Sequence, residues 1–307
     1  MPTKLQIIKT FLWISIAGSL INCTRNDAVK NISHNQVGVL KHPTLPKQIK
    51  FFGQDISLMD IDLKERLDRE LLVNTYFQSS TSLAIKRSTR YFPTIEQILK
   101  EEGVPDDFKY LCVIESNLSN VTSPAGAGGF WQFMPSTAPE YGIRITSEID
   151  ERNHLEKSTR AACQLIKNNY TLFNDWINAC AAYNRGPGGL MQDMKSQGVR
   201  HFFDTEMNPE TARYVFRIIA LKLIMEHPAD YGYNIPEKAC YSQIKTKEVK
   251  TNQPIKNIAL WARKHGTTLK NIRVLNPWIL TNQLSVKAVP CSIAIPANKQ
   301  ELGVFKK

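Results

Sequence analysis

Between residues 55 and 235 the apolar positions recur at intervals of three and four, the spacing that places side chains on one face of an α-helix. The first such stretch runs from Asp62 to Leu83. Further helices are predicted at residues 94–102, 106–117, 159–173, 175–184 and 209–226. This part of the chain is therefore predicted to be a mainly α-helical domain.

Glycine, proline and serine residues mark several predicted helix ends. Gly103 follows one helix and Pro105 opens the next, since glycine favours the C-terminal cap and proline the first turn. Ser158 is predicted to cap the helix at residues 159–173, and Pro209 to occupy the first turn of the last helix. These residues support the boundaries that the apolar spacing predicts.

A second, smaller domain is predicted after a turn-rich segment between His227 and Pro236. Its expected elements are a strand at residues 241–250, helices at 255–264 and 268–275, and a strand at 292–296. The chain is thus expected to end in a βααβ domain at residues 239–297, with a tail at 298–307.

The N-terminus has the composition of an export signal. Lys4 and Lys9 precede an apolar run at residues 11–21, which is too short to cross a bilayer comfortably. No later segment of the sequence is apolar enough to cross a membrane. Residues 24–54 are polar and contain prolines, which favours a tether.

The segment Leu20-Ile-Asn-Cys23 resembles the lipobox of bacterial lipoproteins, in which the cysteine is acylated after cleavage. Asn22 departs from the small residue that is usual there. The resemblance implies a signal peptide at residues 1–23 and a lipid on Cys23 that anchors the protein at the periplasmic face of the outer membrane. An ordinary signal peptide cleaved nearby and an uncleaved anchor helix are the alternatives.

The formal net charge of +11 comes from basic residues scattered along the chain rather than gathered in one arm. This distribution argues against nucleic acid as a partner. In an exported protein it favours encounters with anionic envelope polymers and lipid head groups, although a merely soluble surface is the alternative.

The five cysteines other than Cys23 do not indicate a disulfide framework. Three of them lie in apolar helical patterns and are predicted to be small core residues, namely Cys112, Cys163 and Cys180. A disulfide between Cys240 and Cys291 is the alternative that stays open, although each is expected to begin one strand of an antiparallel pair and hence to lie at its opposite ends. No C-x-x-C or paired-histidine pattern indicates a metal site.

One carboxyl group stands out as a candidate acid. A helix at residues 106–117 places Phe108, Leu111 and Glu115 on one face, so the carboxyl of Glu115 shares the side that is buried. Burial and the negative end of the helix dipole both raise its pKa. A carboxylic acid that stays protonated near neutral pH can donate a proton to a glycosidic oxygen. The alternative is a structural or solvated glutamate, which is the usual role of a single glutamate in a helix.

Ordered motifs around Glu115 carry a family resemblance. They are Glu115-Ser116, Gly129-Phe-Trp-Gln132 and Ala182-Tyr-Asn-Arg-Gly186, with further blocks at Asp106–Tyr110, Asp150–Arg152 and Glu210–Val215. Over residues 55–235 the chain resembles the soluble lytic transglycosylase catalytic domain, in the form found in membrane-bound lytic murein transglycosylases of the D type. The resemblance implies a lysozyme-like helical domain.

The same resemblance implies a reaction on peptidoglycan glycan strands. Glu115 is expected to protonate the glycosidic oxygen between N-acetylmuramic acid and N-acetylglucosamine, then to accept the proton of the muramoyl 6-hydroxyl. That hydroxyl attacks the anomeric carbon and forms a 1,6-anhydro ring. Because water is not consumed, the second carboxylate of most glycosidases is dispensable, and no metal or organic cofactor is expected.

The resemblance also assigns residues around the acid. Gln132 and Phe133 are expected to line the groove, with Gly128 and Gly129 letting the backbone approach the sugar closely. Trp131 is predicted to lie in the core rather than to form a sugar platform, because aromatic residues at a turn usually pack inward.

Five further residues are expected to contact substrate or the catalytic carboxyl. Tyr183 is predicted to hydrogen bond the glutamate or the substrate acetamido group, and Asn184 to shape the turn beneath it. Ser116 is expected to orient the muramoyl lactyl or peptide portion, and Glu210 and Tyr214 to close the groove. For Tyr183, Asn184, Glu210 and Tyr214 the alternative is a structural role, such as a buried tyrosine satisfied by backbone.

Two positions depart from the family pattern. Arg185 stands where alanine is usual, which adds a cation expected to lie beside the groove and to contact a peptide carboxylate. Phe130 replaces leucine, a change that a packed loop should absorb.

Residues 239–297 are similar to a LysM module, a βααβ domain that holds glycans containing N-acetylglucosamine. The Gly-Asp-Thr-Leu turn usual in such modules is replaced by Thr251-Asn-Gln-Pro-Ile255. Because that turn normally contributes to the glycan groove, glycan binding and a packing or spacing role both remain open.

The leading hypothesis is therefore an exported lytic transglycosylase. A lysozyme-like hydrolase that uses Asp150 or Glu151 as its second carboxylate is the alternative enzyme. A wall-binding or scaffolding protein without activity is the alternative from another class, against which intact Glu115, Gln132 and Tyr183 argue.

Overall fold

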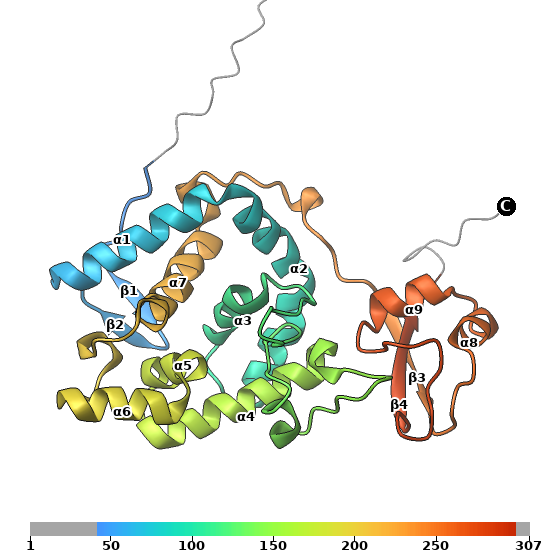
Figure 1. The fold of residues 1–307 in the computed structure, drawn as a ribbon. Helices are drawn as coiled ribbons and strands as arrows, with labels where there is room; N and C mark the ends of the chain where they lie inside the picture. Colours follow the sequence, from blue (N-terminus) through green and yellow to red (C-terminus); the bar gives the residue numbers. More distant parts are fainter. Residues whose placement is uncertain (1–41, 299–307) are drawn as a thin grey trace, which may run out of the picture. The chain divides into compact units, whose positions relative to one another are not determined.

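The computed structural model describes residues 42–298 and is mainly helical up to residue 231 (Figure 1). The predicted signal peptide, Cys23 and residues 299–307 of the predicted tail lie outside the described residues. Between residues 42 and 298, no helix combines the length and the apolar character needed to cross a membrane.

Along the described residues, one pair of short strands precedes the long helices, and a second pair of strands encloses the last two helices. The elements are β1 (Ile49–Phe51), β2 (Gln54–Ile56), α1 (Ile61–Tyr76), α2 (Gln78–Glu101), α3 (Phe108–Ser116), α4 (Leu155–Phe173), α5 (Trp176–Arg185), α6 (Pro187–Gln197), α7 (Pro209–Glu226), β3 (Thr246–Thr251), α8 (Ile258–Lys264), α9 (Leu269–Leu275) and β4 (Cys291–Pro296). Short 3₁₀ helices connect them at η1 (Ala138–Tyr141), η2 (Glu151–Asn153), η3 (Phe202–Asp204), η4 (Pro228–Tyr231) and η5 (Glu237–Ala239).

Helix α7 is central to the helical domain, because it packs against α1, α3 and α5 (Figure 1). Helix α4 packs against α2 and α5 in the same domain. The ends of α7 follow from its sequence, since the Asn208 side chain accepts hydrogen bonds from the first turn and Pro209 needs no hydrogen-bond acceptor. The prediction for Pro209 is confirmed.

Several predicted boundaries differ from those of the structure. The stretch from Asp62 to Leu83 contains parts of two helices, which meet at Phe77. Helix α2 continues through Pro93, so the prediction of a separate helix at residues 94–102 was wrong. Ser158 lies inside α4 and is buried, because this helix begins four residues earlier than the polar position suggested. Helix α6 was not predicted.

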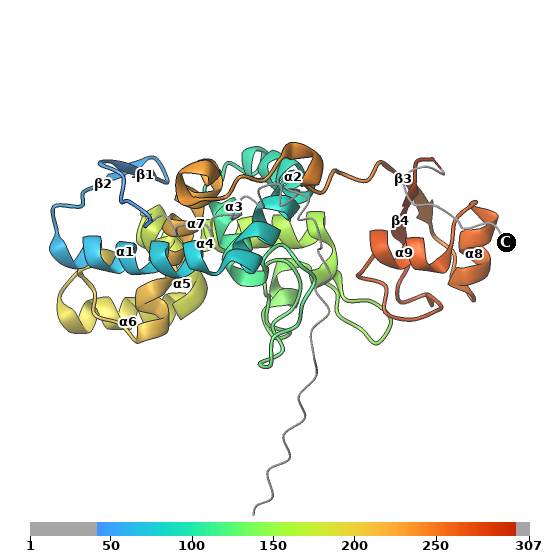
Figure 2. The same cartoon turned by 90° about the horizontal axis from the view of Figure 1, so that it is seen from above.

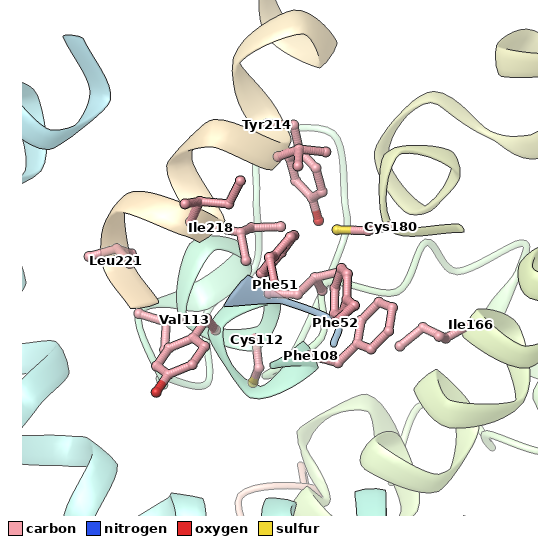
Figure 3. Close-up of a cluster of buried hydrophobic side chains, with 14 of the residues drawn as sticks. Phe51, Phe52, Phe108, Cys112, Val113, Ile166, Cys180, Tyr214, Ile218 and Leu221 are labelled. Carbon is pink, nitrogen blue, oxygen red and sulfur yellow. The ribbon is translucent and has the colours of Figure 1, made fainter. Parts of the chain in front are cut away.

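The β1–β2 hairpin belongs to the core of the helical domain. Phe51 and Phe52 are buried, and the ring of Phe52 stacks on that of Phe108 at a centroid distance of 4.2 Å. Figure 3 shows both phenylalanines among buried side chains that include Ile218 of α7. The predicted tether at residues 24–54 was therefore too long, because the apolar side chains of residues 49–52 are packed rather than solvated.

The C-terminal domain has the predicted βααβ order. Strands β3 and β4 are antiparallel, with Thr246 opposite Pro296 and Thr251 opposite Cys291. Helices α8 and α9 lie beside this ribbon (Figure 2), and Ile258 and Ile272 contribute fully buried side chains to a separate core. The fold class, mainly α followed by a small βααβ domain, is confirmed.

The cysteines of the described residues carry free thiols. Cys112, Cys163 and Cys180 are buried, as predicted for small core residues. Cys291 begins β4, whereas Cys240 precedes β3 and lies outside the ribbon.

Candidate active site

Glu115 lies in the last turn of α3, which is short because the chain reverses directly after it. Asn117 and Leu118 adopt positive φ angles of 51° and 52°, which end the helix. Phe108 and Leu111 are fully buried on the same helix, and Glu115 is partly buried. The predicted buried face of this helix is therefore confirmed.

The environment of Glu115 favours its protonated form. Burial raises the pKa of Glu115 to about 7, and the negative charge of Glu210 acts in the same direction. A hydrogen bond from Tyr214 and the charge of Arg217 act in the opposite direction. Each of these effects is smaller than that of burial, and the effect of Glu210 is the smallest. This carboxyl can therefore hold a proton near neutral pH, which is the property required of a general acid.

Tyr214 is the hydrogen-bond partner of the Glu115 carboxyl. Its hydroxyl, which comes from α7, donates to Oε1 of Glu115. The side chain of Tyr214 is buried, and burial beside Glu115 raises the pKa of the phenol, so that it stays a donor. Tyr214 was expected to close the groove, which stays a prediction, and its bond to the carboxyl was not predicted.

Tyr183 does not hydrogen bond Glu115. Its hydroxyl donates to the backbone oxygen of Trp131 at 2.8 Å. The expected bond to the carboxyl was wrong, because the phenol of this α5 residue is used to hold the glycine-rich loop. Whether the substrate acetamido group also contacts Tyr183 stays a prediction.

The loop at residues 126–133 is held close to the helices by several contacts. Cys112 donates a hydrogen bond from its thiol to the backbone oxygen of Phe130 at 3.4 Å. Trp131 is fully buried and donates from Nε1 to Oγ1 of Thr159 at 2.9 Å, so its predicted place in the core is confirmed. Phe130 is also buried, which shows that the loop accommodates it.

Gln132 and Phe133 are less available to a substrate than was expected. Gln132 has a positive φ of 49°, and its Nε2 donates to the backbone oxygens of Val121 and Gly129 at 3.0 and 2.8 Å. Phe133 is 3% exposed, which places its ring within the protein. Contact between a sugar and either residue therefore stays a prediction.

Gly128 and Gly129 are close to Arg152. A Cβ atom added to Gly128 would lie 2.8 Å from the guanidinium carbon of Arg152, and one added to Gly129 would lie 1.9 Å from its backbone oxygen. Glycine is therefore required at these positions by the packing of Arg152, and a close approach of their backbone to a sugar stays a prediction.

Arg152 is a site residue to which the sequence assigned no role. Its Nη1 donates to the backbone oxygens of Gly126 and Phe133 at 2.7 and 3.0 Å, which joins the two ends of the loop. The motif Asp150–Arg152 marked this arginine. Nothing in the sequence connects it to a loop that lies 19 to 26 residues away.

Ser116, Asn184 and Glu210 lie in different surroundings. Ser116 is buried and donates to the backbone oxygen of Cys112 at 3.2 Å, so its expected contact with a peptide portion is not supported. Asn184 accepts a hydrogen bond from Oγ1 of Thr211 at 3.0 Å, which ties α5 to α7. Glu210 is exposed in the first turn of α7, where it can face a ligand.

The two carboxylates considered for a hydrolase are both engaged in ion pairs. Asp150 pairs with Arg152 at 2.7 Å. Glu151 is 1% exposed and pairs with Arg144 and Lys157 at 2.6 and 2.5 Å. Burial alone would raise the pKa of Glu151, but the hydrogen bonds from these cations hold it below its ordinary value. These contacts argue for structural roles.

Arg185 has a partner within the protein. Its guanidinium pairs with Asp193 of α6 at 2.7 Å. The cation expected beside the groove is therefore paired with a carboxylate of the protein, and its contact with a peptide carboxylate stays a prediction.

Comparisons with known proteins agree with the motifs. Residues 92–204 match the family model of the transglycosylase SLT domain, and residues 247–299 match that of the soluble lytic transglycosylase C-terminal LysM-like domain. Membrane-bound lytic murein transglycosylase D from Escherichia coli K12 is 30% identical over 180 residues, which are 57% of this chain and 39% of that protein. The chain thus spans about two fifths of that relative's length.

A solved structure with a partial likeness is the 70 kDa soluble lytic transglycosylase SLT70 from Escherichia coli. It superposes with a TM-score of 0.42 and 19% identity, over 58% of this chain and 33% of that chain. The two family models cover Glu115 and the βααβ domain respectively. The chain therefore carries a transglycosylase SLT domain that contains Glu115, followed by a soluble lytic transglycosylase C-terminal LysM-like domain.

Proposed function

We propose that this protein is a lytic transglycosylase that cleaves the β-1,4 bond between N-acetylmuramic acid and N-acetylglucosamine in peptidoglycan. The observation that carries the proposal is the carboxyl of Glu115, whose pKa burial raises to about 7, inside a matched SLT domain. The family match and the murein transglycosylase relative support the substrate class.

In the proposed reaction Glu115 acts first as an acid. It transfers its proton to the glycosidic oxygen, the bond from that oxygen to the anomeric carbon breaks, and the N-acetylglucosamine hydroxyl leaves. The acetamido oxygen of the substrate stabilises the oxocarbenium-like carbon. Tyr214 donates to Oε1 of Glu115 and thereby orients the carboxyl and stabilises the carboxylate that forms.

Glu115 then acts as a base. The carboxylate accepts the proton of the muramoyl 6-hydroxyl, whose oxygen bonds to the anomeric carbon and closes the 1,6-anhydro ring. The proton returns to Glu115, so the catalyst is regenerated without water. The ion pairs of Asp150 and Glu151 support this scheme over hydrolysis, since neither carboxylate is free to activate water.

The groove is proposed to be lined by residues around this carboxyl. Exposed Glu210 and half-buried Asn184 are the candidates from α7 and α5, and Tyr183 and Gln132 hold the loop beside the acid. Ser116 and Phe133 are proposed to support the site from beneath, since both are buried.

Export and membrane anchoring belong to the proposal as well. The lipobox resemblance at Cys23 supports acylation and a periplasmic location at the outer membrane. Metabolic labelling with a palmitate analogue tests this step, because a Cys23→Ser variant should lose the label.

The activity is tested with purified sacculi. The wild-type protein should release soluble fragments, and Glu115→Gln should reduce the rate by about 10³-fold or more because it cannot donate a proton. Equal clearing by the two proteins would show that Glu115 has no catalytic role.

A further inference from the structure

A segment of the SLT domain is inserted into the core of the LysM-like domain. Ile149 precedes η2 and forms an antiparallel bridge with Ile279, which follows α9. The side chain of Ile149 is 0% exposed and belongs to the cluster of buried residues that includes Ile258 and Ile293. The small domain therefore completes its core with a side chain from the catalytic domain.

Backbone hydrogen bonds flank this buried side chain on both sides. The amide of Asp150 donates to the backbone oxygen of Trp278 at 2.8 Å, and the amide of Leu280 donates to that of Glu148 at 2.8 Å. Residues 148–150 thus pair with the loop after α9 in the manner of a short added strand. This pairing fixes the backbone of Asp150.

Side chains strengthen the same contact. Oε2 of Glu148 accepts a hydrogen bond from the amide of Ser285 at 2.8 Å. Arg144 donates from Nη1 to the backbone oxygen of Ala288 at 3.3 Å and also pairs with Glu151. Both partners of the LysM-like domain belong to its α9–β4 loop.

The paired segment leads directly to the loop of the candidate active site. The carboxylate of Asp150 accepts hydrogen bonds from Nε and Nη2 of Arg152 at 2.9 and 2.7 Å, and these bonds orient the guanidinium. The remaining nitrogen, Nη1, donates hydrogen bonds to the backbone oxygens of Gly126 and Phe133. Gly128 lies against the same guanidinium, so a shift of Arg152 must shift the loop.

We propose that the LysM-like domain positions the loop at residues 126–133 by holding residues 148–150 in place, with Ile149 as the positioning residue. The path runs from Ile149 through Asp150 to Arg152 and ends at the loop that carries Gln132. This inference rests on the proposed function, because the effect on rate requires that the protein cleaves glycan. It gives the small domain a role that does not depend on its holding a glycan.

The test uses the full chain and a short soluble glycan strand as substrate. Ile149→Ser removes the buried anchor and should lower kcat about tenfold while KM changes less than twofold, because the loop is displaced rather than the substrate lost. Ile149→Val should restore kcat to within about twofold of wild type, since it retains an apolar branched side chain. Leu260→Ser, on the exposed face of α8, serves as the control and should leave both constants unchanged.

Hydrogen exchange supplies the second readout. In Ile149→Ser the amides of residues 126–133 should exchange faster. Glu148→Ala, which removes only the contact with Ser285, should give the same pattern with a loss of about two- to threefold in kcat. It replaces Ile149→Ser if that variant does not fold.

Wild-type kcat together with accelerated exchange at residues 148–150 would overturn the proposal, because these residues would then be released without consequence. A KM increase with unchanged kcat would equally overturn it and indicate a glycan-binding role. An inactive wild-type protein would contradict the proposed function instead, and exchange at residues 126–133 would still decide whether holding residues 148–150 in place positions the loop.

Discussion

Tyr214 of α7 donates a hydrogen bond to Oε1 of Glu115 in α3, which joins two residues that are 99 positions apart in the sequence. Burial raises the pKa of Glu115 to about 7, and this hydrogen bond limits the increase. The contact therefore lowers the pH up to which Glu115 stays protonated and can donate a proton. It also fixes the direction of the carboxyl relative to α7.

The pH dependence of the wild-type enzyme follows from this pKa. Glu115 must be protonated in the free enzyme to act as an acid, so kcat/KM should fall through a midpoint of about 7 and then decrease tenfold per pH unit. Initial rates on a soluble glycan strand, taken at several pH values, measure this decrease in kcat/KM, which is the alkaline limb of the pH profile. A rate that increases with pH through neutrality would show that the ionised carboxyl is the active form.

Replacing Tyr214 with phenylalanine should shift that limb to higher pH. The phenol lowers the pKa of Glu115, so its loss raises the pKa, by about 1 unit if the bond is worth what hydrogen bonds to charged groups usually contribute. The maximal rate should fall about tenfold, because the carboxylate formed in the transition state loses a donor.

Tyr233→Phe is the matched control. This tyrosine is also buried, and its hydroxyl donates to the backbone oxygens of Asn74 and Thr75 at 3.1 and 2.7 Å, contacts that do not involve Glu115. The Tyr233→Phe protein should have a lower free energy of unfolding than wild type, but its kcat/KM should decrease over the same pH range as that of wild type. Equal pH profiles for Tyr214→Phe and Tyr233→Phe would show that the contact with Glu115 does not tune its pKa.

The helical domain could be predicted largely from periodicity, because helices such as α1 and α2 bury residues at intervals of three and four. Helix α6 could not, since it presents little apolar surface and buries only Leu190 and Met194. The β1–β2 hairpin was hidden in a segment whose overall composition is polar. Its apolar residues are buried only because they pack against helices that are distant in the sequence.

The candidate site also has one part that could be predicted from the sequence and one that could not. Glu115 could be found from its helix face and motif, whereas the identity of the tyrosine that hydrogen bonds its carboxyl, Tyr214 rather than Tyr183, could not. Both tyrosines lie in family motifs, and the identity of the partner depends on how α7 packs against α3. The buried contact of Ile149 likewise depends on the packing of two domains, which leaves no periodic signal.

Gly129 should not tolerate a side chain. Its φ is +78°, and a Cβ would lie 1.9 Å from the backbone oxygen of Arg152, so Gly129→Ala should lower the free energy of unfolding by about 3 kcal/mol. Urea unfolding of the two proteins measures the difference.

Gly188→Ala is the control for that substitution. Apart from its chain neighbours and the backbone of its own helix, no described atom lies within 4 Å of a Cβ added at Gly188 in α6, so the free energy of unfolding should change by no more than about 0.5 kcal/mol. If Gly129→Ala were as stable as Gly188→Ala, the loop would not be packed on Arg152 as described.

The raised pKa of Glu115 also predicts how stability depends on pH. Between its ordinary value of 4.5 and the folded value of about 7, the folded protein holds a proton that the unfolded chain has released. The contribution of Glu115 is therefore fully present below pH 4.5 and is lost as the pH rises to about 7. The slope is at most about 1.4 kcal/mol per pH unit.

Glu115→Gln cannot titrate and should lack this slope. Its free energy of unfolding relative to wild type should therefore increase as the pH rises from 5 to 7 and stay constant above that. Urea unfolding at several pH values measures the difference. A difference that is independent of pH would mean that the folded pKa of Glu115 is not raised.

The central claim, that Glu115 catalyses a transglycosylation in which the substrate supplies the nucleophile, is tested most directly by mass spectrometry of the fragments released from sacculi. Digestion in water enriched in oxygen-18 should give 1,6-anhydromuramoyl ends without incorporated label, and Glu115→Gln should give no such ends. Fragments that end in reducing muramic acid carrying oxygen-18 would contradict the account, because water would then be the nucleophile.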